Sequence, residues 1–119
     1  MYSINNKNYP CGTSLTMKYV GGKWKAIILM HLIKGKKRYN ELNKGIQTIT
    51  ERTLSLQLKQ LEADGLITRT VYTSKPPLTV EYALTEFGST LIPVLENISE
   101  WGKATAEKAE KQTRSTEAT

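Results

Sequence analysis

ITERTLSLQLKQLEADGL, residues 49–66, is the stretch that decides the fold. At about 100° per residue, Leu54, Leu58 and Leu61 share one narrow sector, which predicts an amphipathic helix that turns these leucines toward a core. The opposite sector and its flanks carry Arg52, Thr53, Ser55, Leu56, Lys59 and Gln60. Taken alone, this pattern fits an ordinary helix with a solvated polar face, so the neighbouring segments must decide its meaning.

Short polar residues mark both ends of this helix. Thr50 is a suitable N-cap, and Glu51 suits the positive end of the helix dipole. Thr48 with Glu51 forms a competing capping box, which leaves the first turn uncertain by about two residues. Asp64-Gly65 ends the helix, with Gly65 supplying the left-handed residue after the C-cap.

The chain has 119 residues, 39% of them hydrophobic and 24% charged, which suits one globular core. No apolar run approaches the ~20 residues of a membrane span, and the first residues lack the basic-then-apolar order of a signal peptide. We therefore expect a cytoplasmic protein. The single cysteine, Cys11, excludes an intrachain disulfide and any metal site built from several cysteines.

The net charge of +6 is unevenly distributed along the chain. From Lys18 to Lys59 there are ten Lys and Arg against two Glu, which gives +8. From Gln60 onward six cations face nine acids, which gives −3, and Lys7 adds the remaining +1. A basic first half joined to an acidic second half indicates one face for polyanions and another for a different contact.

The first half of the chain reads as an arm followed by helices. Residues 1–12 read as an irregular arm, and Thr13 or Ser14 can cap a short helix over 15–20. Residues 23–33 form the most hydrophobic helix, apolar almost all round, so we expect it to be buried at the centre of the domain.

Residues 36–39 read as a short extended piece before a third helix. Asn40 can cap that helix over 41–44, with Leu42 facing inward. A turn then leads to the helix of residues 49–66.

After Gly65 the hydrophobic period changes from 3.6 to 2. Residues 66–73 and 79–84 are rich in β-branched and aromatic side chains and predict a hairpin. Between them lies a loop over 74–78, which Pro76 and Pro77 stiffen because proline cannot donate to a strand ladder.

The predicted domain organisation has four parts. They are a flexible arm over 1–12 carrying Cys11, a domain over 13–85, a helix over 86–111 that supports dimerisation, and a disordered tail over 112–119. Pro93 lies inside the long helix and should kink it or mark a second start.

This order of elements predicts an α+β fold, mainly α: a winged helix-turn-helix with a C-terminal dimerisation helix. In such a fold the leucine-anchored helix enters the major groove of DNA and the hairpin, or wing, reaches the adjacent backbone.

Three segments carry a resemblance to a known family: GGKWKAIILMHLIKGKKRYNEL (21–42), ITERTLSLQLKQLEADGLITRTVY (49–72) and PPLTVEYALTEFGSTLIPVLENISEWG (76–102). In their order they resemble the HxlR family of bacterial regulators, relatives of the MarR group, over roughly residues 11–101. The resemblance implies a homodimeric, DNA-binding transcription factor without enzymatic activity. The wing departs from the family pattern, because Leu78-Thr79 stands where a basic residue is commoner. Lys36 likewise stands where proline is commoner.

The predicted DNA contacts lie on the leucine-anchored helix and around it. Arg52, one turn from the helix start, is placed to reach a base edge, whereas Lys59 is better placed for a phosphate. For each contact the alternative is a solvated side chain. The full predicted set is Lys37, Arg38, Asn40, Thr50, Arg52, Thr53, Ser55, Leu56, Lys59 and Lys75.

Cys11 is the candidate for redox sensing. It precedes a predicted helix, whose dipole favours the thiolate, and the basic half of the chain is close by. Proteins that resemble this family often carry a cysteine in the N-terminal arm, and some use it to sense oxidants or electrophiles. In a dimer, Cys11 could form an intersubunit disulfide or a mixed disulfide with a small thiol. The alternative is a small residue that packs the arm against the domain.

Nothing in the sequence predicts a catalytic centre, a metal site or a cofactor. His31 stands alone inside a hydrophobic helix, with no second ligand at metal spacing, and is expected to be structural. No glycine-rich phosphate loop, paired carboxylates or nucleophile–base set is present.

The C-terminal helix has an apolar face beyond what a small core needs. We expect a two-fold dimer seam on this face, formed by Leu91, Leu95, Ile98 and Trp101. A dimer doubles the leucine-anchored helices and predicts a pseudo-palindromic operator with half-sites about one turn apart.

These observations together favour a dimeric, nucleoid-associated transcriptional regulator, most simply a repressor, that responds to thiol-reactive or oxidative stress through Cys11. A winged-helix module that binds protein instead of DNA is the main alternative. A regulator triggered by a small molecule at the dimer interface differs only in its signal, and a thiol enzyme using Cys11 is a distant third.

Overall fold

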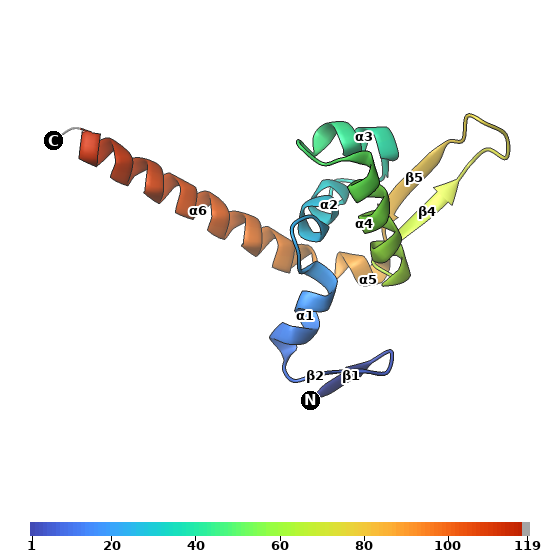
Figure 1. Ribbon diagram of the computed structural model, residues 1–119, viewed down its shortest axis with the longest axis horizontal. Helices are drawn as coiled ribbons and strands as arrows, with labels where there is room; N and C mark the ends of the chain where they lie inside the picture. The colour runs from blue at the N-terminus through green and yellow to red at the C-terminus, as the bar shows by residue number, and fades with distance from the viewer. Residues whose placement is uncertain (118–119) are drawn as a thin grey trace.

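The computed structural model describes residues 1–117, with side chains through residue 112. A small helical body carries three extensions, which are the hairpin of β4 and β5, the long helix α6 on the opposite side, and the N-terminal hairpin below (Figure 1). In chain order the elements are β1 (Tyr2–Ile4), β2 (Lys7–Tyr9), α1 (Gly12–Val20), α2 (Lys25–Leu32), β3 (Lys37–Arg38), α3 (Tyr39–Gly45), α4 (Glu51–Ala63), β4 (Ile67–Val71), β5 (Val80–Leu84), α5 (Glu86–Ser89) and α6 (Ile92–Glu117). The predicted α+β winged helix-turn-helix is confirmed.

The core lies between α2, α3, α4 and the base of the sheet. The three leucines that define the inner face of α4 are at most 2% exposed, as the sequence predicts. Ile28 and Leu29 of α2 and the predicted inward residue Leu42 of α3 are fully buried beside them. Burying each such side chain contributes roughly 1.5–3 kcal/mol, so this cluster fixes how α4 is rotated on the body.

Both ends of α4 are held by local hydrogen bonds. Thr50 is the N-cap, and its hydroxyl oxygen accepts from the backbone N–H of Thr53 at 3.1 Å. At the other end the Leu66 N–H donates to the Leu61 carbonyl and the Gly65 N–H to that of Glu62, with Gly65 at φ +77°. This pair of bonds is a Schellman motif, which needs a residue in the left-handed region. The competing start at Thr48 is wrong, because Thr48 lies in the preceding turn at φ +70°.

The wing is part of a three-stranded antiparallel sheet in the order β3-β5-β4. Ile67 pairs with Leu84 and Arg69 pairs with Tyr82, so these four side chains lie on one face of the sheet. Ile67 and Tyr82 on that face are buried. Arg69 is the first position along β4 where this face is no longer covered by the core.

The N-terminal arm is not irregular, contrary to prediction. β1 and β2 form an antiparallel ladder in which Tyr2 pairs with Tyr9 and Ile4 with Lys7. Asn5 and Asn6 make the turn at φ +50° and +65°. Two successive positive φ values define the turn that best matches the twist of a hairpin, and asparagine tolerates them well.

Three predicted helix starts shift in the structure. α1 begins at Gly12, with Cys11 as its N-cap in place of Thr13 or Ser14. α2 begins at Lys25, two residues later than predicted. α3 begins at Tyr39, so Asn40 is inside the helix and does not cap it.

The start of α3 is instead held by an acidic side chain. The Arg38 N–H donates to the carboxylate of Glu41 at 2.9 Å. This bond satisfies a backbone donor at the helix end, the role that the sequence assigned to Asn40.

The C-terminal region consists of two helices. Thr85 caps α5 by accepting from the Gly88 N–H at 2.9 Å, and α6 starts anew with Pro93 in its first turn, where a missing N–H costs nothing. The second start predicted at Pro93 is therefore confirmed. α6 continues to Glu117, so the predicted disorder is wrong for residues 112–117, while 118–119 lie outside the described residues.

An ion pair ties α1 to the end of α4. Lys18 Nζ donates to Asp64 Oδ1 at 2.7 Å, and the side chains are 17% and 18% exposed. The hydrogen bond and charge of Asp64 raise the pKa of Lys18 against the opposing effect of its burial. Because Asp64 is the C-cap of α4, the two helices are joined where α4 meets the wing.

Gly88 is a position where a side chain would clash with the backbone. A Cβ atom there would overlap the carbonyl oxygen of Leu66, whereas one at Gly102 in α6 would meet nothing within 4 Å. We predict that Gly88→Ala lowers the free energy of unfolding by roughly 1–3 kcal/mol through overpacking. The matched Gly102→Ala should raise it by roughly 0.5–1 kcal/mol, because alanine loses less entropy in a helix. Urea denaturation of both variants tests this, and equal effects would contradict it.

Candidate nucleic-acid interface

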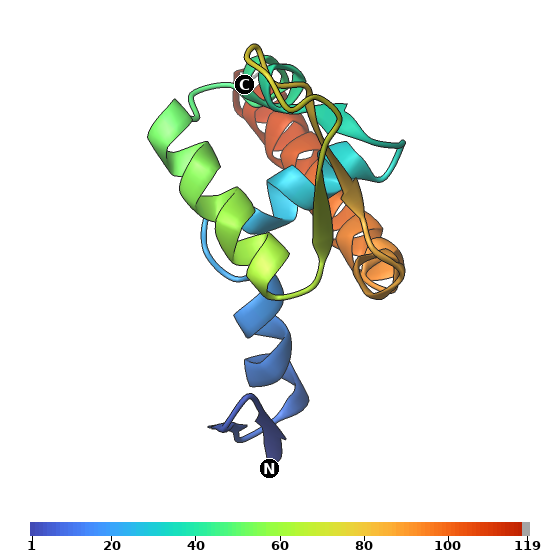
Figure 2. The same ribbon diagram turned by 90° about the vertical axis from the view of Figure 1, so that its right-hand side faces the viewer.

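The outward face of α4 carries the main candidate DNA contacts. Arg52, Leu56 and Lys59 are exposed, opposite the buried leucines, with Leu56 at 53% exposure despite its apolar side chain. Figure 2 shows α4 standing at the outside of the body, beside the wing. Since the core fixes the rotation of the helix, these three side chains are held outward together.

The shorter polar residues of α4 are engaged in internal hydrogen bonds. The hydroxyl of Thr50 donates to the hydroxyl of Thr53 at 2.9 Å, in addition to its capping bond. Tyr39 donates to the Glu51 carbonyl at 2.9 Å and shares a hydrogen bond with the Ser55 hydroxyl at 3.2 Å. These contacts brace the first two turns of α4 against α3.

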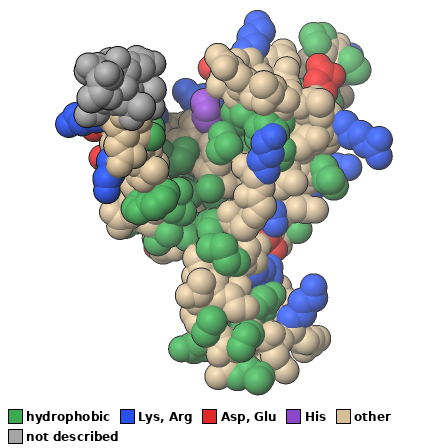
Figure 3. Space-filling model, turned by 60° about the vertical axis from the view of Figure 1, so that its left-hand side comes forward, with side chains coloured by type: hydrophobic (Ala, Val, Ile, Leu, Met, Phe, Trp, Pro, Cys, Tyr) green, Lys and Arg blue, Asp and Glu red, His purple; other side chains and the backbone are tan. Residues whose placement is uncertain are grey.

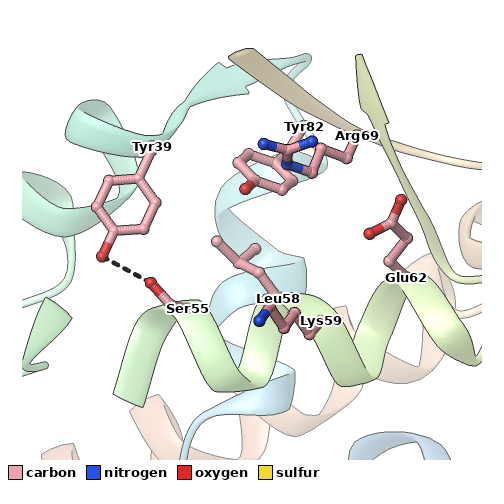
Figure 4. Close-up of a pocket in the computed structure, with 7 residues that line it drawn as sticks. All are labelled: Tyr39, Ser55, Leu58, Lys59, Glu62, Arg69 and Tyr82. Atoms are coloured by element: carbon pink, nitrogen blue, oxygen red, sulfur yellow. Dashed lines mark hydrogen bonds between the residues drawn. The ribbon is translucent and has the colours of Figure 1, made fainter. Parts of the chain in front are cut away.

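A hollow of about 330 Å³ separates α4 from the wing. Its lining comes from α3, α4, β4 and β5: Tyr39, Ser55, Leu58, Lys59, Glu62, Arg69 and Tyr82 (Figure 4). In this view Arg69 reaches from β4 over the hollow, while Lys59 and Glu62 lie on α4 beneath it.

A second hollow, of about 350 Å³, lies between the start of α3 and the wing loop. Arg38 and Asn40, two of the predicted phosphate contacts, line it together with Pro77 and Leu78. The structure therefore brings these two predicted residues to the wing side of the body.

Lys37 and Lys75 are placed apart from that group. Lys37 is half-buried and lines a different hollow, with Met30, His31 and Lys34 of the α2 end. Lys75 is exposed in the wing loop. The structure thus separates Lys37 from its chain neighbour Arg38, because successive strand residues point to opposite faces.

Sequence reasoning missed Tyr39 and Arg69. Arg69 occupies a position that the alternation of β4 assigns to the apolar face, between Ile67 and Val71. A cation at an inward-facing position of a strand marks a candidate binding residue, since a charged side chain on the inner face must leave the core or find a partner.

The predicted dimer residues divide into two groups. Leu95 is 1% exposed and belongs to the core of the single chain, so its assignment to the seam is wrong. Leu91 is half-buried and packs against that core. Ile98 and Trp101, one and two turns farther along α6, are 47% and 73% exposed. Figure 3 shows hydrophobic side chains gathered near the base of α6 and around the N-terminal hairpin.

Cys11 is an exposed free thiol at the start of α1. Among the described residues, no group of three or more His, Cys, Asp or Glu is arranged to hold a metal ion. Within the same residues, no helix combines the length and apolar character needed to cross a bilayer.

Comparison with known families matches residues 19–110 to the HxlR-like helix-turn-helix model. The chain is 50% identical over 101 residues to the uncharacterized HTH-type transcriptional regulator YdeP of Bacillus subtilis, covering 85% of this chain and 78% of that protein.

Among solved structures, the chain is similar to the redox regulator HypR in two states. The reduced form is 46% identical with a TM-score of 0.78, covering 85% of this chain and 99% of HypR. The oxidized form is 49% identical with a TM-score of 0.74, covering 79% and 96%.

Proposed function

This chain belongs to the HxlR-like helix-turn-helix family of transcriptional regulators, and on that premise we propose that it binds a pseudo-palindromic operator as a homodimer and represses transcription. The observation that carries the proposal is the outward row of Arg52, Leu56 and Lys59, held opposite the buried leucines of α4. A guanidinium can read guanine, a leucine can contact a thymine methyl, and an ammonium can meet a phosphate.

Dimerisation is supported by the apolar surface that α6 leaves uncovered. Val94, Ile98 and Trp101 are all more than a third exposed, and Met17 of α1 and Ile27 of α2 add further apolar exposure. Ile98 also lines an apolar hollow with Ile27, between α6 and α2. A two-fold partner would cover this surface and set two copies of α4 at the spacing of two operator half-sites, about one turn of DNA apart.

A redox response is supported by the likeness to HypR and by the position of Cys11. Cys11 begins α1, and Lys18 near the end of the same helix binds the C-cap of α4. A displacement of α1 would therefore reach the helix that reads DNA. Oxidation removes two hydrogen atoms from two thiols and joins them as a disulfide, either between protomers or with a small thiol.

We also propose that the protein performs no catalysis and acts in the cytoplasm on the nucleoid. Membership of a regulator family supports both statements. A protein-binding winged helix remains the alternative, and salt dependence of binding separates the two, because counterion release accompanies contact with DNA.

Arg52→Ala tests the DNA-reading face. With a duplex selected from a random library by the wild-type protein, we expect loss of discrimination worth roughly 1–3 kcal/mol against unrelated duplex. Lys103→Ala removes an equal charge from α6 and should leave discrimination intact. Fluorescence anisotropy across a salt series measures both. Wild-type binding that ignores salt would favour the protein-binding alternative.

Trp101→Glu tests the dimer. Placing a charge on the exposed face of α6 should shift the protein from dimer to monomer and weaken operator binding, because half-sites are then bound independently. Leu78→Glu adds the same charge to the exposed wing loop and should stay dimeric. Sedimentation velocity measures the mass of each variant, and a dimeric Trp101→Glu would place the seam elsewhere.

Cys11→Ser tests the redox response. Diamide should weaken operator binding by the wild type, and dithiothreitol should restore it, since diamide takes up the two hydrogen atoms that the thiols lose. The Cys11→Ser protein should bind equally well with and without diamide. Equal loss of binding in this variant, which has no other thiol, would refute the role of Cys11.

A further inference from the structure

We propose that Arg69 of β4 and Lys59 of α4 together hold one backbone phosphate of the DNA in the hollow between the recognition helix and the wing. The inference rests on the proposed function and deepens it, because it adds a residue from the strand to the contact surface. It also assigns a ligand, a single phosphate group, to a hollow whose lining residues come from four different elements.

The geometry of the hollow suits an anion. Arg69 and Lys59 are exposed cations that reach the same hollow from two elements (Figure 4). Leu58 and Tyr82, which are 2% and 7% exposed, close its inner side. The volume of about 330 Å³ has room for roughly ten water molecules, hence for a phosphate group with part of its hydration.

Neither cation is neutralised within the described residues. The ion pairs found there join Lys18 to Asp64, Lys36 to Glu81 and Lys103 to Glu100, and none includes Arg69 or Lys59. A guanidinium also offers a planar fork of donors that matches phosphate oxygens. Two unpaired cations facing one hollow repel each other, so an anion between them is stabilising.

The position of the hollow identifies the anion as part of the DNA backbone. When α4 lies in the major groove and the hairpin reaches the adjacent backbone, the DNA strand at that edge of the groove passes between these elements. The hollow lies at that place, between α4 and β4. Its cations therefore face phosphates and not base edges.

Glu62 lines the same hollow and opposes the anion. In Figure 4 its carboxylate rises from α4 toward β4, at the end of the hollow away from Tyr39. A carboxylate there weakens phosphate binding by like-charge repulsion. Removing its charge should therefore tighten DNA binding, which is the opposite of the effect of removing either cation.

The test uses Lys59→Gln, Arg69→Gln and the double variant, with the selected duplex across a salt series. Arg69→Gln should weaken binding roughly tenfold, as expected for one charge-assisted hydrogen bond. Arg69→Lys should keep most of the salt slope, and Glu62→Gln should bind more tightly than wild type. Lys103→Gln is the control for net charge. Arg69 is exposed, so thermal melts should show all variants folded.

The double variant separates one shared phosphate from two. If both cations hold the same phosphate, the salt slope of the double variant falls by about 0.9, one contact, and the affinity losses are less than additive. A fall in the salt slope equal to two phosphate contacts would show that the two cations hold different phosphates and would overturn the shared site. A methylphosphonate removes the charge of a single phosphate. At the phosphate that Arg69 and Lys59 hold, it should weaken wild-type binding and leave the affinity of the double variant unchanged.

Two further outcomes would also overturn the proposal. If Arg69→Gln binds with wild-type affinity, the hollow holds no DNA phosphate. If Lys103→Gln loses as much affinity as Arg69→Gln, only the net charge of the protein matters. In either case discrimination lost in Arg52→Ala would still support the proposed function. Failure of the wild type to bind any duplex would instead overturn the proposed function itself.

Discussion

Burial of one leucine stripe determines how the protein presents its surface. Leu54, Leu58 and Leu61 have almost no exposure, and rotating α4 by one residue, about 100°, would move them off the core and swing Arg52 away from its outward direction. The energetic cost of that rotation, several kcal/mol for three side chains, keeps the outward face in one orientation. The residues that α4 presents outward are thus specified from inside the domain, by side chains that are themselves buried.

The same rigidity passes from α4 into the wing through the backbone. The Schellman motif at Gly65 sets the angle at which the chain leaves α4, and the Thr85 hydroxyl donates to the Gly65 carbonyl. Gly88 packs so closely on Leu66 that no side chain fits between α5 and this junction. The wing is therefore held relative to α4 at its base, so that Arg69 faces α4 across a defined hollow. A phosphate site shared by two elements requires such a fixed angle.

The sequence predicts those parts of the structure that have a repeating pattern. The leucine stripe, the Thr50 cap, the stop at Gly65, the period-2 hairpin and the family resemblance all follow from it. A sequence pattern is ambiguous where one residue type can serve two purposes. Leu95 continues the helical stripe of the seam but packs into the single chain, and periodicity cannot tell which partner covers an apolar face. Asn5-Asn6 favours a turn, but the strands on either side are only three residues long and leave a weak pattern. The alternation of β4 places Arg69 on the inner face, but only the pairing with Tyr82 shows which side chains surround it.

The ion pair between α1 and α4 connects the helix that follows Cys11 to the end of α4. Cys11 is the N-cap of α1, and Lys18, seven residues farther along the chain, binds Asp64, so α1 links the thiol to the C-cap of α4. Both side chains of the Lys18–Asp64 pair are part-buried, so its geometry constrains the two helices more than a fully solvated pair would. Moving α1 would therefore either break this pair or shift the end of α4. Because the wing leaves α4 at Gly65, which is bonded to the last turn of the helix, a shift there would also move β4 and Arg69.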